Sequence, residues 1–166
     1  MSYPAYPPGN PYAPAAPDSL HLPRYGATFG EAVKRYFRKY ATFSGRASLS
    51  EYWWVALFNA LVGIVAVVAM IMSGALDVDP ASAEMPPGAA LVELLVNLYS
   101  LATLIPTWAL AVRRLHDANL SGWLSLLVLV PLVGFVAVLV FTLMQANPAG
   151  ARFDKGQAWP AGYPAS

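Results

Sequence analysis

Hydrophobic and polar residues are segregated into long blocks along the chain. From Tyr52 to Leu76 no residue is charged, and this run exceeds the roughly 20 residues that an α-helix needs to cross about 30 Å of hydrocarbon. Two further apolar runs follow, and each is also long enough to cross. The pattern predicts an all-α, polytopic membrane protein with transmembrane helices at residues 52–74, 91–112 and 123–145.

The second and third runs contain residues that interrupt a regular helix. Pro106 is expected to kink the second helix, and Pro131 and Gly134 stand near the middle of the third. A bend at these last two residues would make the third segment re-entrant, so that the C-terminal residues return to the side from which it starts. This topology is the alternative to three complete crossings.

Polar side chains within the spans are few. A rise of about 1.5 Å per residue places Asn59 and Asn97 roughly 10 Å apart in depth, so we do not expect them to pair with each other. Each is expected to bond a backbone carbonyl or a neighbouring subunit instead.

A shorter amphipathic pattern precedes the first span. Residues 28–41 begin with a capping-box pattern, in which Thr28 is followed three residues later by Glu31. Aromatic residues recur at helical spacing on one face, and basic residues lie mostly on the other, namely Lys34, Arg35, Arg38 and Lys39. The arrangement predicts an interfacial helix in the headgroup layer of an anionic membrane. The alternative is a soluble helix whose aromatic residues pack on a core.

Proline indicates where the N-terminal tail ends. Residues 1–27 are rich in Pro, Ala and Tyr, and since proline fixes φ and lacks an N–H group, we expect a disordered tail there. Residues 28–155 form the predicted membrane domain, and residues 156–166 form a short C-terminal tail.

The composition supports the membrane assignment. Hydrophobic residues make up 57% of the chain and charged residues only 11%, against about 25% charged in soluble domains. The chain has no cysteine, which excludes disulfides, thiol catalysis and Cys-ligated zinc.

The placement of charge predicts the orientation. The loop at 77–90 carries acidic residues and no Lys or Arg, whereas Arg113 and Arg114 follow the second span. The segment before the first span is basic and contains Arg24, Lys34, Arg35, Arg38, Lys39 and Arg46. Because basic loops stay on the cytoplasmic side, the N-terminus and the charged turn at 113–122 are expected to face the cytoplasm, and three crossings would leave the C-terminus outside.

Two polar clusters meet the membrane on this predicted cytoplasmic side. Each ends in tryptophan where a helix enters lipid, which predicts interfacial anchors at Trp53, Trp54 and Trp123. An arginine near the bilayer seeks a carboxylate, a carbonyl or a lipid phosphate. We therefore predict an ion-pair network that ties the two clusters together, built from Arg46, Glu51, Arg113, Arg114, His116 and Asp117. The alternative is that the same residues hold an anionic headgroup or a small anionic ligand.

The two clusters also carry a family resemblance. The pattern F-x-G-R-x-S-x-x-E-Y-W from Phe43 and the turn R-R-L-H-D-x-x-x-S-G-W from Arg113 resemble the bacterial membrane family called domain of unknown function 805, over roughly residues 36–155. The resemblance implies a small inner-membrane protein of unassigned activity. Family members often close with an N-R-F-G-like stretch, where this chain has Ala151-Arg152-Phe153-Asp154.

The sequence shows no recognisable nucleophile, metal site or cofactor site. His116 has only His21 as a second histidine, which is too few ligands for haem or zinc, and the basic helix is too short to argue nucleic-acid binding. We therefore predict a non-enzymatic, multi-pass inner-membrane protein without a cofactor. It would organise anionic lipid or a partner membrane protein, and the alternative is a homo-oligomeric channel or transporter.

Overall fold

The computed structural model describes residues 20, 22–75, 85–130, 134, 136, 139–140 and 143–154, and these residues contain helices and no strand. The elements are the α-helices α1 (Phe29–Arg38), α2 (Leu49–Met72) and α3 (Pro87–Asp117), followed by the 3-10 helices η1 (Gly122–Leu129) and η2 (Pro148–Phe153). The predicted all-α class is confirmed for this part of the chain.

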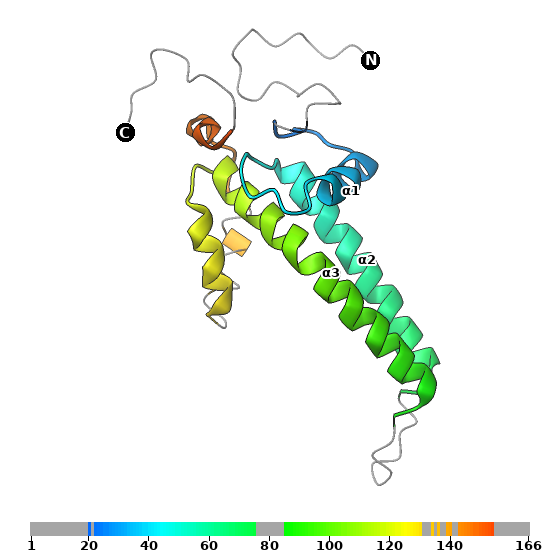
Figure 1. The fold of residues 1–166 in the computed structure, drawn as a ribbon. Helices are drawn as coiled ribbons and strands as arrows, with labels where there is room; N and C mark the ends of the chain where they lie inside the picture. Colours follow the sequence, from blue (N-terminus) through cyan, green and yellow to red (C-terminus); the bar gives the residue numbers. More distant parts are fainter. Residues whose placement is uncertain are drawn as a thin grey trace.

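Helices α2 and α3 form a long antiparallel pair (Figure 1). They contain 24 and 31 residues, so at about 1.5 Å per residue both exceed the roughly 30 Å of a hydrocarbon core. Both are apolar enough to cross a membrane. Most of their large hydrophobic side chains are exposed on the isolated chain, including Ile64, Val65 and Leu101, which suits a surface covered by lipid.

The ends of the pair differ from the predicted ones because local caps set them. Helix α2 begins at Leu49, where Ser48 is the N-cap and Glu51 completes a capping box with it. Helix α3 continues to Asp117, so the first five residues of the predicted turn at 113–122 are helical. This extension holds the charged residues of that segment on a rigid element.

Helix α1 lies across the ends of α2 and α3 where Leu49 and Asp117 are found (Figure 1). Its predicted capping box is confirmed, since the Thr28 side chain accepts from the Glu31 N–H and the Glu31 side chain accepts from the Thr28 N–H. The aromatic face packs on α2, where the rings of Phe29 and Phe37 lie 6.4 and 6.2 Å from the ring of Phe58.

Pro106 stands inside α3 and creates an opening in its hydrogen-bond ladder. Proline has no N–H group, so the Ala102 carbonyl has no donor four residues later. The hydroxyl of Tyr40, just beyond α1, donates to that carbonyl. One turn earlier, within α1, the hydroxyl of Tyr36 lies 2.8 Å from the Thr107 hydroxyl. The proline thus contributes to the docking of α1 on α3.

The predicted third crossing is not confirmed, because the chain turns back after η1. Val130 is extended, with φ −95° and ψ 108°, as expected for a residue before proline. The Gly134 N–H donates to the Val130 carbonyl at 2.8 Å. A Cβ on Gly134 would lie 1.7 Å from the Leu127 carbonyl oxygen, so only glycine fits this close approach.

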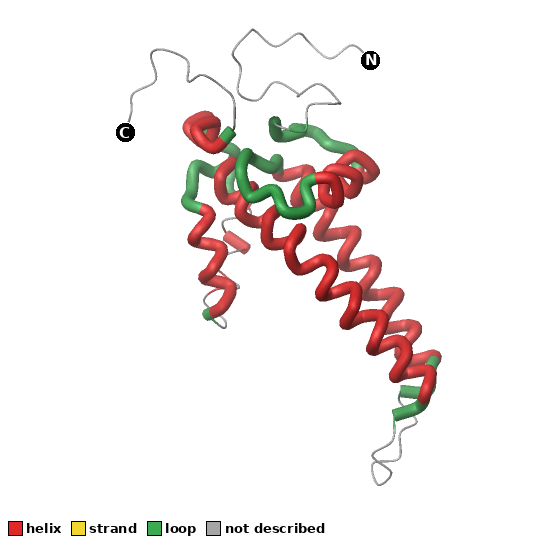
Figure 2. The backbone as a smooth tube through the Cα atoms, in the orientation of Figure 1, coloured by secondary structure: helices red, strands yellow, loops and turns green. Residues whose placement is uncertain are grey.

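The residues after this reversal return to the same end of α3 (Figure 2). Arg114 donates through Nη2 to the Met144 carbonyl, and the Asn147 N–H donates to the Asp117 carbonyl at 2.7 Å. The predicted continuous helix at 123–145 is therefore wrong in the described residues, and the bend that the sequence offers as an alternative accounts for the return.

The predicted tails lie largely outside the described residues, as does most of the loop at 77–90. Residues 22–27, predicted as part of the disordered tail, are instead packed on the helices. The Ala27 N–H donates to the Ser50 hydroxyl at 3.0 Å, and Pro23 is fully buried. These contacts move the start of the packed domain ahead of the predicted boundary.

Candidate functional site

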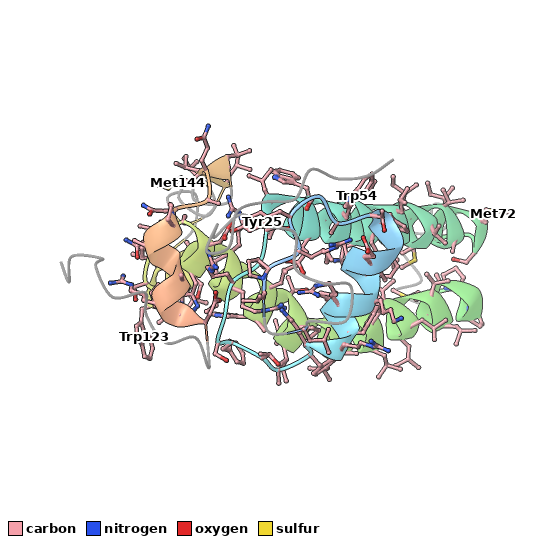
Figure 3. All side chains as sticks on the ribbon, turned by 90° about the horizontal axis from the view of Figure 1, so that it is seen from above. Tyr25, Trp54, Met72, Trp123 and Met144 are labelled. Atoms are coloured by element: carbon pink, nitrogen blue, oxygen red, sulfur yellow. The ribbon has the colours of Figure 1, made fainter. Side chains whose placement is uncertain are left out.

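Charged side chains gather where α1, α2, α3 and η2 meet (Figure 3). We call this group the charge cluster, and it comprises Arg35, Lys39, Arg46, Glu51, Arg113, Arg114, His116, Asp117 and Asp154, all of them buried. Seen from above, Tyr25 lies between Trp123 and Trp54, and Met72 marks the far end of α2. The cluster includes all six residues of the predicted network and adds three that the prediction lacks.

Glu51 joins α1 to α2 at one side of the charge cluster. Its Oε1 accepts from Arg35 Nε, and its Oε2 accepts from the backbone N–H groups of Ser48 at 2.9 Å and Arg24 at 3.3 Å. The carboxylate therefore completes the capping box of α2 and neutralises a buried guanidinium at the same time. The signal for this role is the Ser48-x-x-Glu51 spacing, which is a capping-box pattern like the one at Thr28.

Asp117 occupies the centre of the charge cluster, at the last residue of α3. Its Oδ2 accepts from Arg114 Nη1 and its Oδ1 from the Tyr25 hydroxyl, each at 2.6 Å. Arg46 Nη1 lies 4.0 Å from the same Oδ1. These contacts bring Arg46, Arg114 and Asp117 together at one point of the charge cluster.

Asp154 closes the network from the C-terminal segment. Its Oδ2 accepts from Arg46 Nε at 3.0 Å and from Nη2 at 2.7 Å. The sequence gives no local sign of this role, since Asp154 stands where the resembling family often has glycine. The contact depends on the chain reversal after η1, which no motif near residue 154 reveals.

His116 is held by the loop before α2 and by η2. Its Nδ1 lies 3.1 Å from the Gly45 carbonyl, so this nitrogen carries the proton and donates. The ring stacks on Phe153, with centroids 3.9 Å apart and an interplanar angle of 5°. The Gly45 N–H donates to the Phe153 carbonyl at 2.8 Å. His116 therefore holds Phe153 by ring stacking and the loop before α2 by its hydrogen bond to Gly45.

Arg113 and Lys39 differ from the rest of the charge cluster in lacking a carboxylate partner among the described residues. Arg113 donates through Nε to the Ala109 carbonyl at 3.2 Å, and its Nη2 is buried without a partner. Lys39 is only 4% exposed, and burial lowers its pKa from 10.5 to about 8. The predicted pairing of Arg113 is absent from the described residues, where Glu51 binds Arg35 instead.

The four basic residues of α1 and its cap fall into two kinds, which corrects the predicted membrane-surface set. Lys34 and Arg38 are exposed, as a surface role requires. Arg35 and Lys39, one turn apart, are buried because their face of the helix is turned towards Glu51. The predicted anchors Trp53, Trp54 and Trp123 are all exposed.

The side chain of Asn59, deeper along the helix pair, is bonded within the chain. Asn59 donates through Nδ2 to the Val55 carbonyl at 2.9 Å and accepts from the Tyr99 hydroxyl at 2.7 Å. The expectation of a backbone-carbonyl partner is confirmed for Asn59. Asn97 is exposed.

A groove of about 970 Å³ follows the α2–α3 pair and is bordered by η1. Its lining is mostly apolar, with a few hydroxyl groups such as those of Ser100, Thr103 and Ser125. Among the described residues, no group of three or more His, Cys, Asp or Glu side chains could hold a metal ion.

Comparison with known proteins identifies the family. A family described as "Protein of unknown function (DUF805)" matches residues 40–155, a region that contains both predicted polar clusters and Asp154. The inner membrane protein YhaI of Escherichia coli (strain K12) is 38% identical over 116 residues, which cover 70% of this chain and 86% of YhaI. The inner membrane protein YhaH of the same strain is 31% identical over 116 residues, which cover 70% of this chain and 87% of YhaH. No solved structure matches the chain. The chain belongs to the DUF805 family and is an integral membrane protein.

Proposed function

We propose that this chain is a non-enzymatic inner-membrane protein that organises anionic lipid at the cytoplasmic surface through the charge cluster. The proposal fits a site whose residues are charged, buried and largely bound to one another. It assigns no covalent chemistry to them.

The proposed topology has two crossings. Helices α2 and α3 span the membrane, α1 lies in the headgroup layer, and the reversal after η1 forms a re-entrant hairpin. The basic residues of α1 and the loop before α2 favour the cytoplasmic side for the charge cluster. Residues 143–154 are on that side as well, since Met144 and Asn147 bond the cluster end of α3.

The observation that carries the proposal is an excess of buried positive charge. The charge cluster contains five cations, Arg35, Lys39, Arg46, Arg113 and Arg114, against three carboxylates, Glu51, Asp117 and Asp154. A buried charge without a partner is strongly unfavourable, so an external anion would stabilise the folded protein. The anions that are abundant at this depth are lipid headgroups, which attract basic residues by about 1 kcal/mol each.

The test is the lipid that the protein retains. The purified chain is placed in nanodiscs of mixed phosphatidylglycerol and phosphatidylcholine, and the lipids that stay bound after transfer to detergent are counted by native mass spectrometry. We expect enrichment of phosphatidylglycerol over its bulk fraction, and persistence of that enrichment in the variant Lys34→Gln plus Arg38→Gln, which removes two exposed charges. Retention in proportion to the bulk mixture would overturn the proposal, as would loss of enrichment in this variant.

The alternative of a homo-oligomeric channel or transporter has less support. Asn59 and Tyr99, a polar pair within the helix pair, bond each other, and Asn59 also donates to the Val55 carbonyl, so both side chains already have partners within one chain. Recruitment of a partner membrane protein fits the same surface, and crosslinking in native membranes would identify that partner.

A further inference from the structure

The two ends of the α2–α3 pair differ in the elements that surround them (Figure 1). Where α2 begins and α3 ends, the pair is flanked by α1 and by η1. At the opposite end α2 and α3 lie side by side, since a Cβ on Gly88 would be 3.3 Å from Ser73 Cβ, and the described residues add no further element there. In the part of the chain that the structure describes, the molecule is therefore wide at one end and narrow at the other.

Two tryptophans show at which level of the membrane the wide part lies. Trp53 stands 20 residues before Ser73 at the end of α2. Trp108 likewise stands 20 residues after Gly88 in α3. At about 1.5 Å per residue each stretch is about 30 Å long, which is the thickness of a hydrocarbon core. Because tryptophan is enriched at the membrane–water interface, Trp53 and Trp108 mark the boundary of the core on the side of the charge cluster.

Helix α1 reaches just below this boundary. The ring centroids of Phe29 and Phe37 lie 6.4 and 6.2 Å from that of Phe58. Phe58 stands five residues beyond Trp53, which is about 7 Å deeper along α2. An interfacial helix buries its apolar face by about 5–10 Å, so these ring contacts place α1 at the depth of a helix that lies in a single leaflet. Phe29 and Phe37 also remain exposed, and their free surface is available to lipid.

The 3-10 helix η1 enters the same leaflet alongside α3 (Figure 1). Trp108 Nε1 donates to Ser125 Oγ at 3.0 Å, so Ser125 is level with the boundary. Four more residues follow in η1, up to Leu129, and at about 2.0 Å per residue they reach about 8 Å deeper. The midplane lies about 15 Å below the boundary, so η1 ends before it. Leu126, Val128 and Leu129 are exposed and would contact the acyl chains of this leaflet alone.

We propose that the chain acts as a wedge in the cytoplasmic leaflet and binds selectively to membrane that bulges towards the cytoplasm. Helices α1 and η1, each about 10 Å wide, double the number of helices in that leaflet, and the described residues add none to the other leaflet. Where the cytoplasmic leaflet is convex, its headgroups are spread apart and inserted helices fill the gaps, which makes interfacial binding sensitive to curvature. The inference rests on the proposed two-crossing topology and goes beyond the proposed function to the shape of the lipid surface.

The experiment measures the orientation of the full chain in phosphatidylcholine vesicles of different size. The variants Thr42→Cys, before α2, and Ser82→Cys, between α2 and α3, are each reconstituted by detergent removal, and the vesicles from each preparation are then separated by size. A membrane-impermeant maleimide labels the cysteines that face outwards. We expect near-equal labelling of the two variants in large vesicles. In small vesicles, whose outer leaflet is strongly convex, we expect the label on Thr42→Cys to rise and the label on Ser82→Cys to fall.

A pair of double variants tests whether η1 contributes to the wedge. Trp123→Gln plus Leu129→Gln makes two side chains of η1 polar, and Met72→Gln plus Leu91→Gln is the matched control at the narrow end. All four side chains are exposed, so neither change opens the described core. In the Thr42→Cys background we expect the η1 variant to lose part of its outward excess in small vesicles and the control to keep it. An unchanged excess in an η1 variant that melts with the control overturns the inference. If the η1 variant does not fold, the size dependence of the parent chain decides.

The outcomes separate this inference from the proposed function. Equal orientation in small and large vesicles overturns the inference, as does an excess of outward Ser82→Cys in the small ones. Because these vesicles contain no anionic lipid, either result leaves the proposed role of the charge cluster standing, and that role fails separately if nanodiscs show no enrichment of phosphatidylglycerol. Labelling of Arg152→Cys from the side opposite to Thr42→Cys would overturn the proposed topology and the inference together.

Discussion

Arg46 and Asp154 form a buried, two-bonded ion pair although 108 residues separate them in the chain. Close packing surrounds the pair, since a Cβ on Gly150 would lie 2.3 Å from the His116 carbonyl oxygen and 3.4 Å from Arg46 Cδ. The C-terminal segment is thus built into the end of the α2–α3 pair, and the turn back after η1 is what makes this possible.

Replacement of Asp154 by asparagine should be strongly destabilising. The change leaves Arg46 buried with no carboxylate nearer than Asp117 at 4.0 Å, and breaking a buried pair costs about 3–5 kcal/mol of the free energy of unfolding. Unfolding in mixed detergent measures the loss. The double variant Arg46→Met plus Asp154→Met should lose less than the single one, because no charge stays buried. A single variant within about 0.5 kcal/mol of the wild type would show that the pair is not formed.

A comparison of the two capping boxes distinguishes the contribution of helix capping to stability from the contribution of buried charge. Glu31→Gln and Glu51→Gln make the same chemical change, and glutamine can still cap. Glu31 is part-exposed, so its variant should lose less than about 1 kcal/mol. Glu51→Gln leaves Arg35 buried without its carboxylate and should lose about 3 kcal/mol. Equal losses, measured by the same unfolding assay, would contradict the assignment of Glu51 to the charge cluster.

Tyr40 and Pro106 are predicted to be coupled in a double-mutant cycle. Tyr40→Phe removes the donor to the Ala102 carbonyl and should cost about 0.5–1.5 kcal/mol of the free energy of unfolding. In a Pro106→Ala background the new N–H at residue 106 supplies that donor, so the same tyrosine change should cost markedly less. A cost that is identical in both backgrounds would show that the hydroxyl does not substitute for the missing bond of the helix.

Lys39 is predicted to make both stability and lipid binding depend on pH. Its pKa of about 8 lies below its ordinary 10.5, so between these values the unfolded state binds more protons and the free energy of unfolding should rise with pH, by roughly 3 kcal/mol in all. The groups that face it are Arg35 on its own helix, Glu51 on α2, Arg113 on α3 and Asp154 in the C-terminal segment.

The retention of phosphatidylglycerol should change with pH in the direction opposite to the free energy of unfolding. Because only the protonated amine of Lys39 attracts phosphate, retention should fall as pH rises above about 8. The Lys39→Gln variant removes the titrating amine and serves as the control. The measurement compares the two pH profiles of melting temperature and bound lipid. Profiles of the variant that match those of the wild type would contradict the role of Lys39.

The sequence was informative where structure is encoded locally. The uncharged run from Tyr52 to Leu76 predicts α2, and the Thr28–Glu31 spacing predicts the cap of α1. The network of Arg46, Arg114 and Asp117 was also predictable, since buried arginines need carboxylates.

The missed features depend on contacts between distant segments. Asp154 reaches Arg46 only because the chain turns back after η1, whereas the hydrophobic composition of that segment predicts one more span. The burial of Arg35 and Lys39 depends on which face of α1 meets α2. The amphipathic pattern places the basic residues mostly on one face, and this predicts that they all lie in the headgroup layer.

Cysteine accessibility tests the central claim, that both polar clusters and the C-terminal segment share one side of the membrane. The chain has no cysteine of its own, so three single variants suffice, Thr42→Cys before α2, Ser82→Cys between α2 and α3, and Arg152→Cys in η2. With a membrane-impermeant maleimide on intact cells, the account predicts labelling of Ser82→Cys alone, and labelling of the other two only after the inner membrane is opened. Labelling of Arg152→Cys together with Ser82→Cys in intact cells would contradict it.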